Sequence, residues 1–176
     1  MPSDLPPPAP RPSPSTIVLL MGVAGSGKTT VGRQLAAELH WPYYEADDFH
    51  STANKEKMGR GVPLDDTDRA PWLAAIRRAM DDCVAQGRSA VFSCSALKEK
   101  YREVLAAGLP GLRLVHLAGD RGLLAQRIAG RTGHYMKPGM LDSQLATLEA
   151  PRDALALDIS QSPAELVAAI KRALAL

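Results

Sequence analysis

Residues 16–30 read TIVLLMGVAGSGKTT, an apolar run followed by a glycine-rich turn that ends in Lys28 and Thr29. Within this stretch, residues 22–29 match the pattern G-x-x-x-x-G-K-[ST], which forms a phosphate-binding loop (P-loop) where it joins a β-strand to an α-helix. The stretch meets both conditions, because a strand-like run precedes the pattern and a helical pattern follows it. It therefore predicts an α/β domain that binds a nucleoside triphosphate.

The residue types in the P-loop have separate tasks. Small residues let the backbone wrap closely around a triphosphate with its amides pointing inward, and Gly22, Gly25 and Gly27 allow that wrap. Lys28 can bridge the β- and γ-phosphates, the hydroxyl of Thr29 can ligate magnesium, and the helix that begins near Lys28 adds its amino-terminal dipole. The predicted nucleotide-binding residues here are Gly22, Val23, Ala24, Gly25, Ser26, Gly27, Lys28, Thr29 and, as a weaker contact, Thr30.

Downstream of the P-loop, short apolar runs alternate with helical patterns. This alternation favours βαβ units around a parallel sheet with helices on both faces. Five strands are expected, at residues 16–21, 43–46, 89–94, 113–117 and 154–159. Helices are expected near residues 28–39, 71–86, 98–107, 120–130 and 162–175. Residues 48–70 and 131–142 interrupt the alternation, and such insertions after parallel strands are where ligands bind in open α/β sheets.

The overall composition is that of an ordinary globular protein, with 176 residues, 45% hydrophobic residues and 23% charged residues. A formal net charge of +2 gives no basic field that would argue for nucleic acid. Cys83 and Cys94 lack the spacing of a disulfide or zinc framework. No apolar run is long enough to span a membrane, and no secretion signal is recognisable. We expect a cytoplasmic protein without nucleic-acid or membrane partners.

Proline dominates residues 1–15, MPSDLPPPAPRPSPS. Such a composition favours extended conformations and cannot bury apolar surface. The predicted organisation is a disordered Pro-rich tail at residues 1–15 and a P-loop domain at residues 16–176. A proline-rich ligand for an adaptor domain is the alternative interpretation of the tail.

The residues after the second and third predicted strands distinguish between classes of P-loop protein. The chain contains no NKxD-type run for guanine recognition, and the third strand ends in Ser93-Cys94-Ser95 rather than in the acidic residue of a motor ATPase. Asp47 and Asp48 close the second strand, which would place a carboxylate near the P-loop if that strand neighbours the first. Asp47 is the predicted catalytic group, because such a carboxylate could orient an acceptor hydroxyl and take its proton late. The alternative role, capping the next helix, fits Asp48 better.

Further motifs accompany the P-loop and are more specific than generic P-loop features. They are ADDFH (46–50), NKEKM (54–58), GVPLDDTDRAPWL (61–73), CSALKEKYR (94–102), HLAGD (116–120), RTGHYM (131–136) and LDSQLATLEAP (141–151). From about Thr16 to the C-terminus, the chain resembles the gluconokinases of the thermoresistant, shikimate-kinase-like type. One departure is Ala46 before Asp47, where many relatives have glycine.

The resemblance implies transfer of phosphate from ATP to the 6-hydroxyl of D-gluconate, with Mg2+ as the metal and a homodimer as the assembly. Gluconate is an open-chain polyol with one carboxylate, so its site should combine a cation, ideally a forked guanidinium, with several hydrogen-bonding groups. We predict Arg69 as the carboxylate ligand, by analogy with a similar arginine in shikimate kinases. The predicted substrate-binding residues are Asp47, His50, Lys57, Arg69, Ser95, Lys98, Arg102 and Arg131.

Several of these acceptor-side residues have an alternative structural role. His50 could equally make a structural hydrogen bond, and Lys57 lies in a helical run where a solvated lysine is almost as well supported. Lys98 and Arg102 fall one helical turn apart, so one can bind ligand while the other pairs with a neighbouring glutamate.

A glycine-bounded segment with Arg127, Arg131, His134 and Lys137 has the composition of a mobile lid that closes over phosphates. The resemblance implies that Arg131 contacts the phosphates and that Arg127 stacks on adenine; a solvated basic helix end is the alternative. Residues 158–162 are expected to contribute backbone contacts to adenine. The predicted catalytic residues are Lys28, Asp47 and Arg131. The predicted fold class is a three-layer α/β P-loop kinase fold, with a five-stranded parallel sheet, helices on both faces and a mobile lid.

Two other functions stay open. Another kinase of the same fold, acting on shikimate, a nucleoside monophosphate or a different sugar acid, would share the P-loop and lid and differ around residues 47–72 and 94–102. A nucleotide-binding regulatory protein that recruits partners through its tail would bind ATP without acceptor-dependent turnover.

Overall fold

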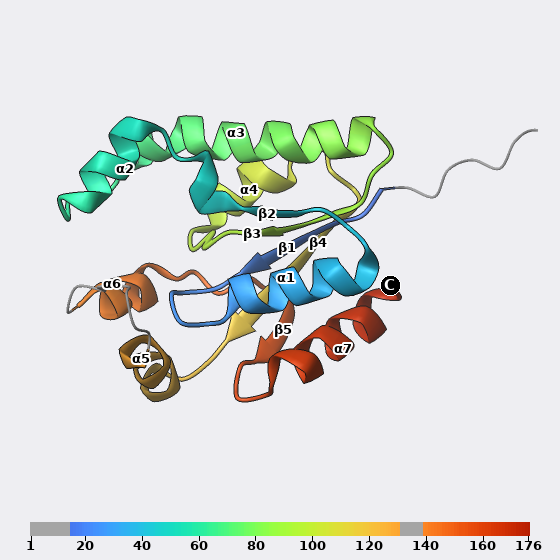
Figure 1. Cartoon of the computed structure of the whole chain (residues 1–176). Coiled ribbons are helices and arrows are strands. Elements are labelled where there is room, and N and C mark those ends of the chain that lie inside the picture. The colour runs from blue at the N-terminus through green and yellow to red at the C-terminus, as the bar shows by residue number, and fades with distance from the viewer. Residues whose placement is uncertain (1–14, 131–138) are drawn as a thin grey trace, which may run out of the picture.

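The computed structural model describes residues 15–130 and 139–176. Its centre is a five-stranded sheet in the order β2-β3-β1-β4-β5, in which all four strand pairings are parallel (Figure 1). The strands are β1 (Ile17–Met21), β2 (Tyr43–Glu45), β3 (Ala90–Ser93), β4 (Leu112–Ala118) and β5 (Leu155–Asp158). The predicted α/β fold class and the five predicted strands are confirmed.

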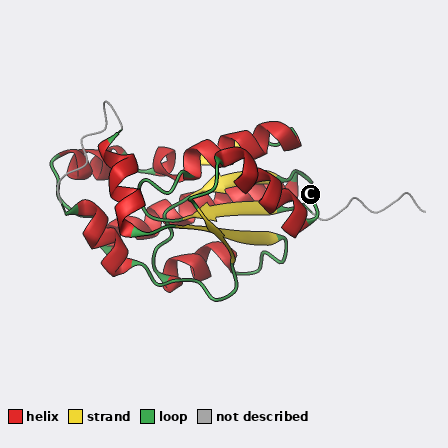
Figure 2. Cartoon of the chain, turned by 90° about the horizontal axis from the view of Figure 1, so that it is seen from below, coloured by secondary structure: helices red, strands yellow, loops and turns green. Residues whose placement is uncertain are grey.

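Helices cover both faces of the sheet and so form the outer two of three layers (Figures 1 and 2). One face carries α3 (Asp66–Ala85) and α4 (Glu99–Ala106), and the other carries α1 (Lys28–Leu39) and α7 (Pro163–Leu174). The remaining elements gather around the carboxyl ends of the strands (Figure 1). They are the 3-10 helix η1 (Ala46–Phe49), α2 (Thr52–Gly59), α5 (Arg121–Ala129) and α6 (Met140–Thr147).

The core lies on both sides of β1, whose five residues are all completely buried. Because side chains alternate along a strand, Ile17, Leu19 and Met21 pack with α3 and α4, whereas Val18 and Leu20 pack with α1 and α7. A strand buried on both faces needs the continuous apolar run that the sequence shows. This central position fixes the end of β1, and with it the P-loop, in the middle of the sheet.

The order of the strands corrects one expectation about Asp47. The second strand does not neighbour the first, because β3 lies between β1 and β2. β2 is instead an edge strand, half-buried and paired through Tyr43, Tyr44 and Glu45 to β3 alone. Asp47 is still within electrostatic reach of the P-loop, because the charge of Lys28 partly offsets the desolvation that raises the pKa of Asp47.

Two helices differ from the expected boundaries. α3 begins at Asp66 rather than near residue 71, because the side chain of Asp65 accepts a hydrogen bond from the amide of Asp68 and the two residues form a capping box. α6 was not expected at all, although its apolar residues recur at helical spacing and pack against the α1 side of the core. These residues are Leu141 and Leu145, continued by Leu148 just after the helix.

Some predicted features lie outside the described residues, namely the tail up to residue 14 and the lid residues Arg131, His134 and Lys137. Both cysteines are buried and unpaired. No helix within the two described ranges combines the length and apolar character of a membrane span.

Candidate active site

The three P-loop glycines adopt backbone conformations that other residues disfavour. Gly22, Gly25 and Gly27 have φ angles of 151°, 82° and 91°. A Cβ atom on Gly22 would approach the carbonyl oxygen of Leu117 to 2.7 Å, and one on Gly25 would approach the side chain of Ile128 to 2.9 Å. Conformation therefore requires glycine at all three positions, and space requires it at Gly22 and Gly25, as predicted from the need for a tightly wrapped loop.

Lys28 is the first residue of α1, and its side chain turns back over the P-loop. Its Nζ donates hydrogen bonds to the carbonyl oxygens of Gly22 (2.9 Å) and Val23 (3.1 Å). The ammonium group is thus held against the loop at the amino-terminal end of α1, where a triphosphate is also attracted by the helix dipole.

Thr29 is joined to a carboxylate that the sequence analysis did not single out. Its hydroxyl donates to Oε2 of Glu45 (2.8 Å), and the same carboxylate accepts hydrogen bonds from Tyr43 (2.6 Å) and Ser93 (2.7 Å). Burial and the bond to Glu45 raise the pKa of Tyr43, so its hydroxyl remains a donor. Glu45 is consequently fixed beside Thr29, which places two hard oxygen ligands together at the P-loop.

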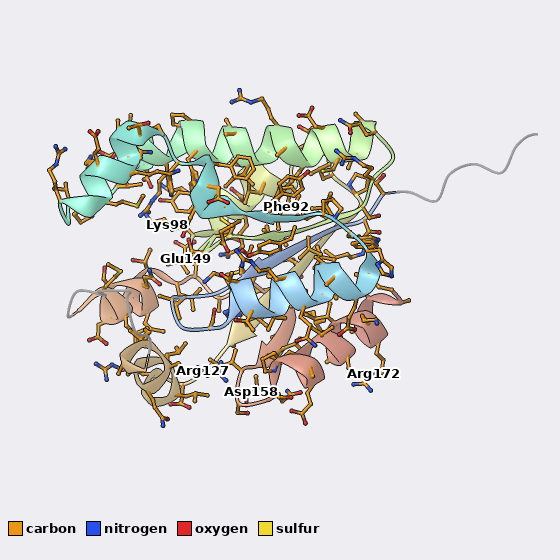
Figure 3. All side chains as sticks on the ribbon, viewed as in Figure 1. Phe92, Lys98, Arg127, Glu149, Asp158 and Arg172 are labelled. Carbon is orange, nitrogen blue, oxygen red and sulfur yellow. The ribbon has the colours of Figure 1, made fainter. Side chains whose placement is uncertain are left out.

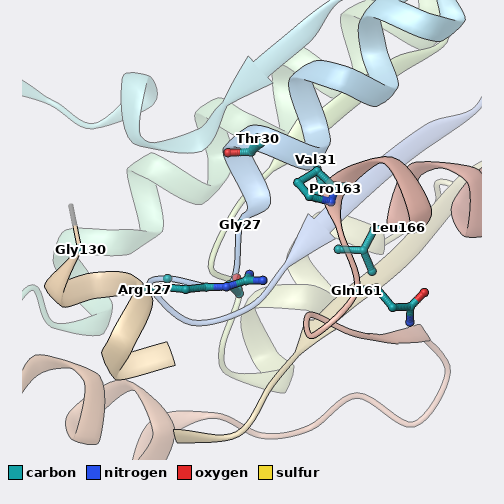
Figure 4. A pocket seen from close by; sticks show the side chains of 10 residues that line it. Gly27, Thr30, Val31, Arg127, Gly130, Gln161, Pro163 and Leu166 are labelled. Carbon is teal, nitrogen blue, oxygen red and sulfur yellow. The ribbon is translucent and has the colours of Figure 1, made fainter. Parts of the chain in front are cut away.

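A cavity of about 270 Å³ opens beside the P-loop on the α7 side of the molecule (Figure 4). Its lining includes Gly27, Thr30, Arg127 and Gln161. Arg127 reaches from α5 toward the P-loop and donates a hydrogen bond to the carbonyl oxygen of Ile159, just after β5. The two features expected on the adenine side, Arg127 and the segment after β5, therefore meet at this one cavity.

Asp47 lies in η1, with its side chain exposed to solvent. Protein atoms crowd its carboxyl group enough that partial desolvation raises its pKa, and the neighbouring charge of Glu45 acts in the same direction. The charges of His50 and Lys28 oppose this rise. Asp47 is thus within electrostatic range of both the P-loop lysine and His50, and the pKa of its carboxyl group is raised above that of an ordinary aspartate.

His50 is a buried residue whose ring stacks on Trp72, with 4.5 Å between ring centroids and 7° between ring planes. Burial lowers the pKa of His50, and the positive charge of Arg69 lowers it further, so its imidazole is neutral near pH 7. Its Nδ1 has no hydrogen-bond partner among the described residues. Trp72 is buried in the core, and its indole nitrogen donates to the carbonyl oxygen of Ala46 (2.7 Å).

A second cavity, of about 120 Å³, lies between the α3–α4 side and α6, and we call it the acceptor pocket. It brings together Arg69 and Ser95, two of the residues predicted to bind substrate. Arg69 donates to the hydroxyl of Tyr101 (3.1 Å), which holds the guanidinium at the pocket wall. The residues lining the acceptor pocket are Arg69, Trp72, Ser95, Leu97, Tyr101, Ser143, Gln144 and Thr147.

Comparison with known proteins places this site in a family. Residues 17–151 match a family model described as an AAA domain. The chain is 48% identical over 136 residues to the gluconokinase of Gluconobacter oxydans, covering 77% of this chain and 76% of that protein. It is 41% identical over 149 residues to the thermoresistant gluconokinase of Escherichia coli, covering 82% and 85%. The chain belongs to the gluconokinase family.

A solved structure agrees with this membership. A gluconokinase from Sinorhizobium meliloti has a TM-score of 0.78 against this chain, at 44% identity and with 90% of each chain covered. The resemblance to the gluconokinase family that was inferred from the motifs is therefore confirmed.

Three basic residues that were expected to bind substrate in this gluconokinase-family site do not line the acceptor pocket. Lys57 pairs with Asp68. Lys98, labelled in Figure 3, is the N-cap of α4 and forms an ion pair with Asp66 at 3.4 Å. Arg102 is buried and donates hydrogen bonds to the carbonyl oxygens that precede α4, at residues 96 and 97. Arg102 thus bonds backbone carbonyl oxygens rather than the neighbouring glutamate that the alternative interpretation had paired with it. None of the three residues lines the acceptor pocket.

α6 contributes residues that the sequence analysis missed in this gluconokinase-family site. Ser143, Gln144 and Thr147 line the acceptor pocket, and the side-chain oxygen of Gln144 accepts a hydrogen bond from the backbone amide of Ala24 (2.7 Å). The motif LDSQLATLEAP contained these residues, but nothing in their local pattern indicated contact with a loop 120 positions away in sequence.

Proposed function

We propose that this protein is a gluconokinase, which transfers the γ-phosphoryl group of ATP to the 6-hydroxyl of D-gluconate and releases ADP and 6-phospho-D-gluconate. The observation that carries this proposal is the position of Asp47. Its carboxyl interacts with Lys28 of the P-loop and with His50, and His50 stacks on the Trp72 wall of the acceptor pocket. Membership of the gluconokinase family supports gluconate as the acceptor over other sugar acids.

The chain supplies each part of the reaction from a separate element. Arg69 binds the gluconate carboxylate, and Asp47 accepts a hydrogen bond from the 6-hydroxyl group, which directs the hydroxyl oxygen at the γ-phosphorus. As the new P–O bond forms, the bond to the β–γ bridging oxygen breaks and the hydroxyl proton passes to Asp47. Lys28 and the P-loop amides stabilise the negative charge on the phosphoryl oxygens.

Thr29 and Glu45 are suited to hold Mg2+, because their hydroxyl and carboxylate oxygens lie together beside the phosphate site. Magnesium in P-loop kinases neutralises charge on the β- and γ-phosphates. Glu45 keeps its orientation through Tyr43 and Ser93, so the carboxylate does not depend on the metal for its position.

A panel of acceptors tests the function directly. The purified protein should release ADP from ATP with D-gluconate well above its ATPase background, but not with shikimate, a nucleoside monophosphate or other sugar acids. 31P NMR should identify the product as the 6-phosphate, and excess EDTA should abolish turnover. Turnover with another acceptor, together with only background activity on gluconate, would contradict the proposal.

Replacing Arg69 with alanine should raise the KM for gluconate by about 10- to 100-fold, since a hydrogen bond to a charged group contributes roughly 1.5 to 3 kcal/mol. The KM for ATP should change little. Arg69→Lys should be intermediate, because lysine keeps the charge but loses the fork that matches a carboxylate. Arg78→Ala, an exposed arginine on the same helix, is the control. An unchanged gluconate KM in Arg69→Ala would place the carboxylate site elsewhere.

A further inference from the structure

Gln144 links the P-loop to the acceptor pocket. Its Oε1 accepts a hydrogen bond from the amide of Ala24 (2.7 Å), and its side chain lines the acceptor pocket. A backbone amide can only donate, so this contact identifies which end of the carboxamide is oxygen. The NH2 end, which carries two donors, is left for the pocket, and no described residue accepts a hydrogen bond from it.

α6 holds Gln144 in a defined place. On the turn before Gln144, Asp142 forms a two-pronged ion pair with Arg121 of α5, at 2.6 and 3.0 Å. Beyond the helix, the amide of Glu149 donates to the carbonyl of Leu97 (2.9 Å), and the Glu149 carboxylate accepts a hydrogen bond from the amide of Glu99. The helix is therefore tied to its neighbours on both sides of Gln144, so its carboxamide projects from a supported element.

The chemistry of the acceptor pocket is asymmetric. Arg69 supplies a cation at one wall, where a carboxylate binds, and α6 supplies neutral polar groups from Ser143, Gln144 and Thr147. A polyol hydroxyl needs donors as well as acceptors around it, and a carboxamide NH2 is a donor that does not attract a second carboxylate. Since Gln144 also touches the P-loop, its donor lies toward the phosphorylated end of the acceptor.

We propose that Gln144 is a specificity-determining residue of the acceptor pocket, whose oxygen is anchored on Ala24 and whose NH2 group donates to the hydroxyl at carbon 4 or 5 of the acceptor. This inference rests on the proposed gluconokinase function. In this arrangement the side-chain carboxamide of Gln144 contacts both the P-loop and the acceptor. A sugar acid with the wrong group near its reactive end loses a hydrogen bond at the place where its 6-hydroxyl must be aligned, and specificity follows from that loss.

A cycle between Gln144→Met and deoxygenated acceptors tests the proposal. Methionine keeps the length of the side chain and removes both polar ends. With D-gluconate, Gln144→Met should raise the KM about 10-fold, the loss expected for one hydrogen bond. The same penalty should appear with 2-deoxygluconate and disappear with 4-deoxy- or 5-deoxygluconate, because the partner hydroxyl is then already missing. An equal penalty for every acceptor, or no penalty at all, would overturn the proposal.

A second variant separates recognition of the acceptor from a purely structural role of the hydrogen bond between Gln144 and Ala24. Gln144→Glu keeps an oxygen for the Ala24 amide but lacks the NH2 donor, so it should retain the thermal midpoint and still show the raised KM. Recovery of the wild-type gluconate KM in Gln144→Glu would show that only the hydrogen bond to Ala24 affects gluconate binding, and it would overturn the proposal. Gln34→Met, on α1, is the matched control and should leave both the gluconate KM and the thermal midpoint unchanged. Failure of the wild-type protein to phosphorylate gluconate would instead reject the proposed function itself.

Discussion

Replacing Lys28 with methionine should lower kcat for gluconate phosphorylation by about 1,000-fold, the upper range found for removal of one charge-stabilising donor. The Lys28 ammonium is already held over the P-loop by the carbonyl oxygens of Gly22 and Val23. The ammonium therefore needs no further ordering when negative charge moves onto the β–γ bridging oxygen. Its full electrostatic contribution is then available to stabilise the transition state. Single-turnover measurements of ADP formation at saturating ATP would report this loss.

The control for Lys28→Met is Lys171→Met on α7. Lys171 pairs with Glu38 at 3.1 Å on the surface, and such pairs contribute little to stability. Both variants should unfold at nearly the wild-type temperature, but only Lys28→Met should lose activity. A kcat within tenfold of wild type in Lys28→Met would mean that the P-loop amides and other cations carry the charge stabilisation without this lysine.

The strands could be predicted because each is a short run rich in apolar residues. The signal is strongest in β1 and β3, whose residues are all buried in the sheet. The order of the strands is not a local property. β2 lies at the edge because α1 carries the chain past the position later filled by β3, and no residue of Tyr43–Glu45 specifies this. The start of α3 was also placed too late, near residue 71, because the capping box at Asp65 begins the helix at Asp66.

The P-loop could be predicted in full because all of its residues are consecutive. The acceptor pocket could be predicted only in part, because it joins α3, the turn after β3 and α6. Charge alone did not separate Arg69, which lines the pocket, from Arg102, whose guanidinium is used to satisfy backbone carbonyls. Neutral residues such as Gln144 carry no charge signal, so only the fold reveals their position.

Replacing Asp47 with asparagine should lower kcat by about 100- to 10,000-fold, the range expected for loss of a general base. Asparagine has nearly the same shape, but its carboxamide cannot take the proton of the 6-hydroxyl group. The gluconate KM should change much less than kcat, because Arg69 and the remaining pocket still bind the acceptor. The neighbouring variant Asp48→Asn is the control and should stay within a few-fold of wild type.

The pH profile gives Asp47 a second, independent signature. A protonated Asp47 cannot accept the substrate proton, so kcat/KM should fall as the pH decreases through the pKa of this group. Desolvation and the charge of Glu45 raise that pKa, so the fall should begin at a higher pH than for an ordinary aspartate, whose pKa is about 3.9. In Asp47→Asn this acidic limb should vanish from the residual activity. If the variant kept the wild-type limb, another group would have to be the base, and Asp47 would lose its assigned role in proton transfer.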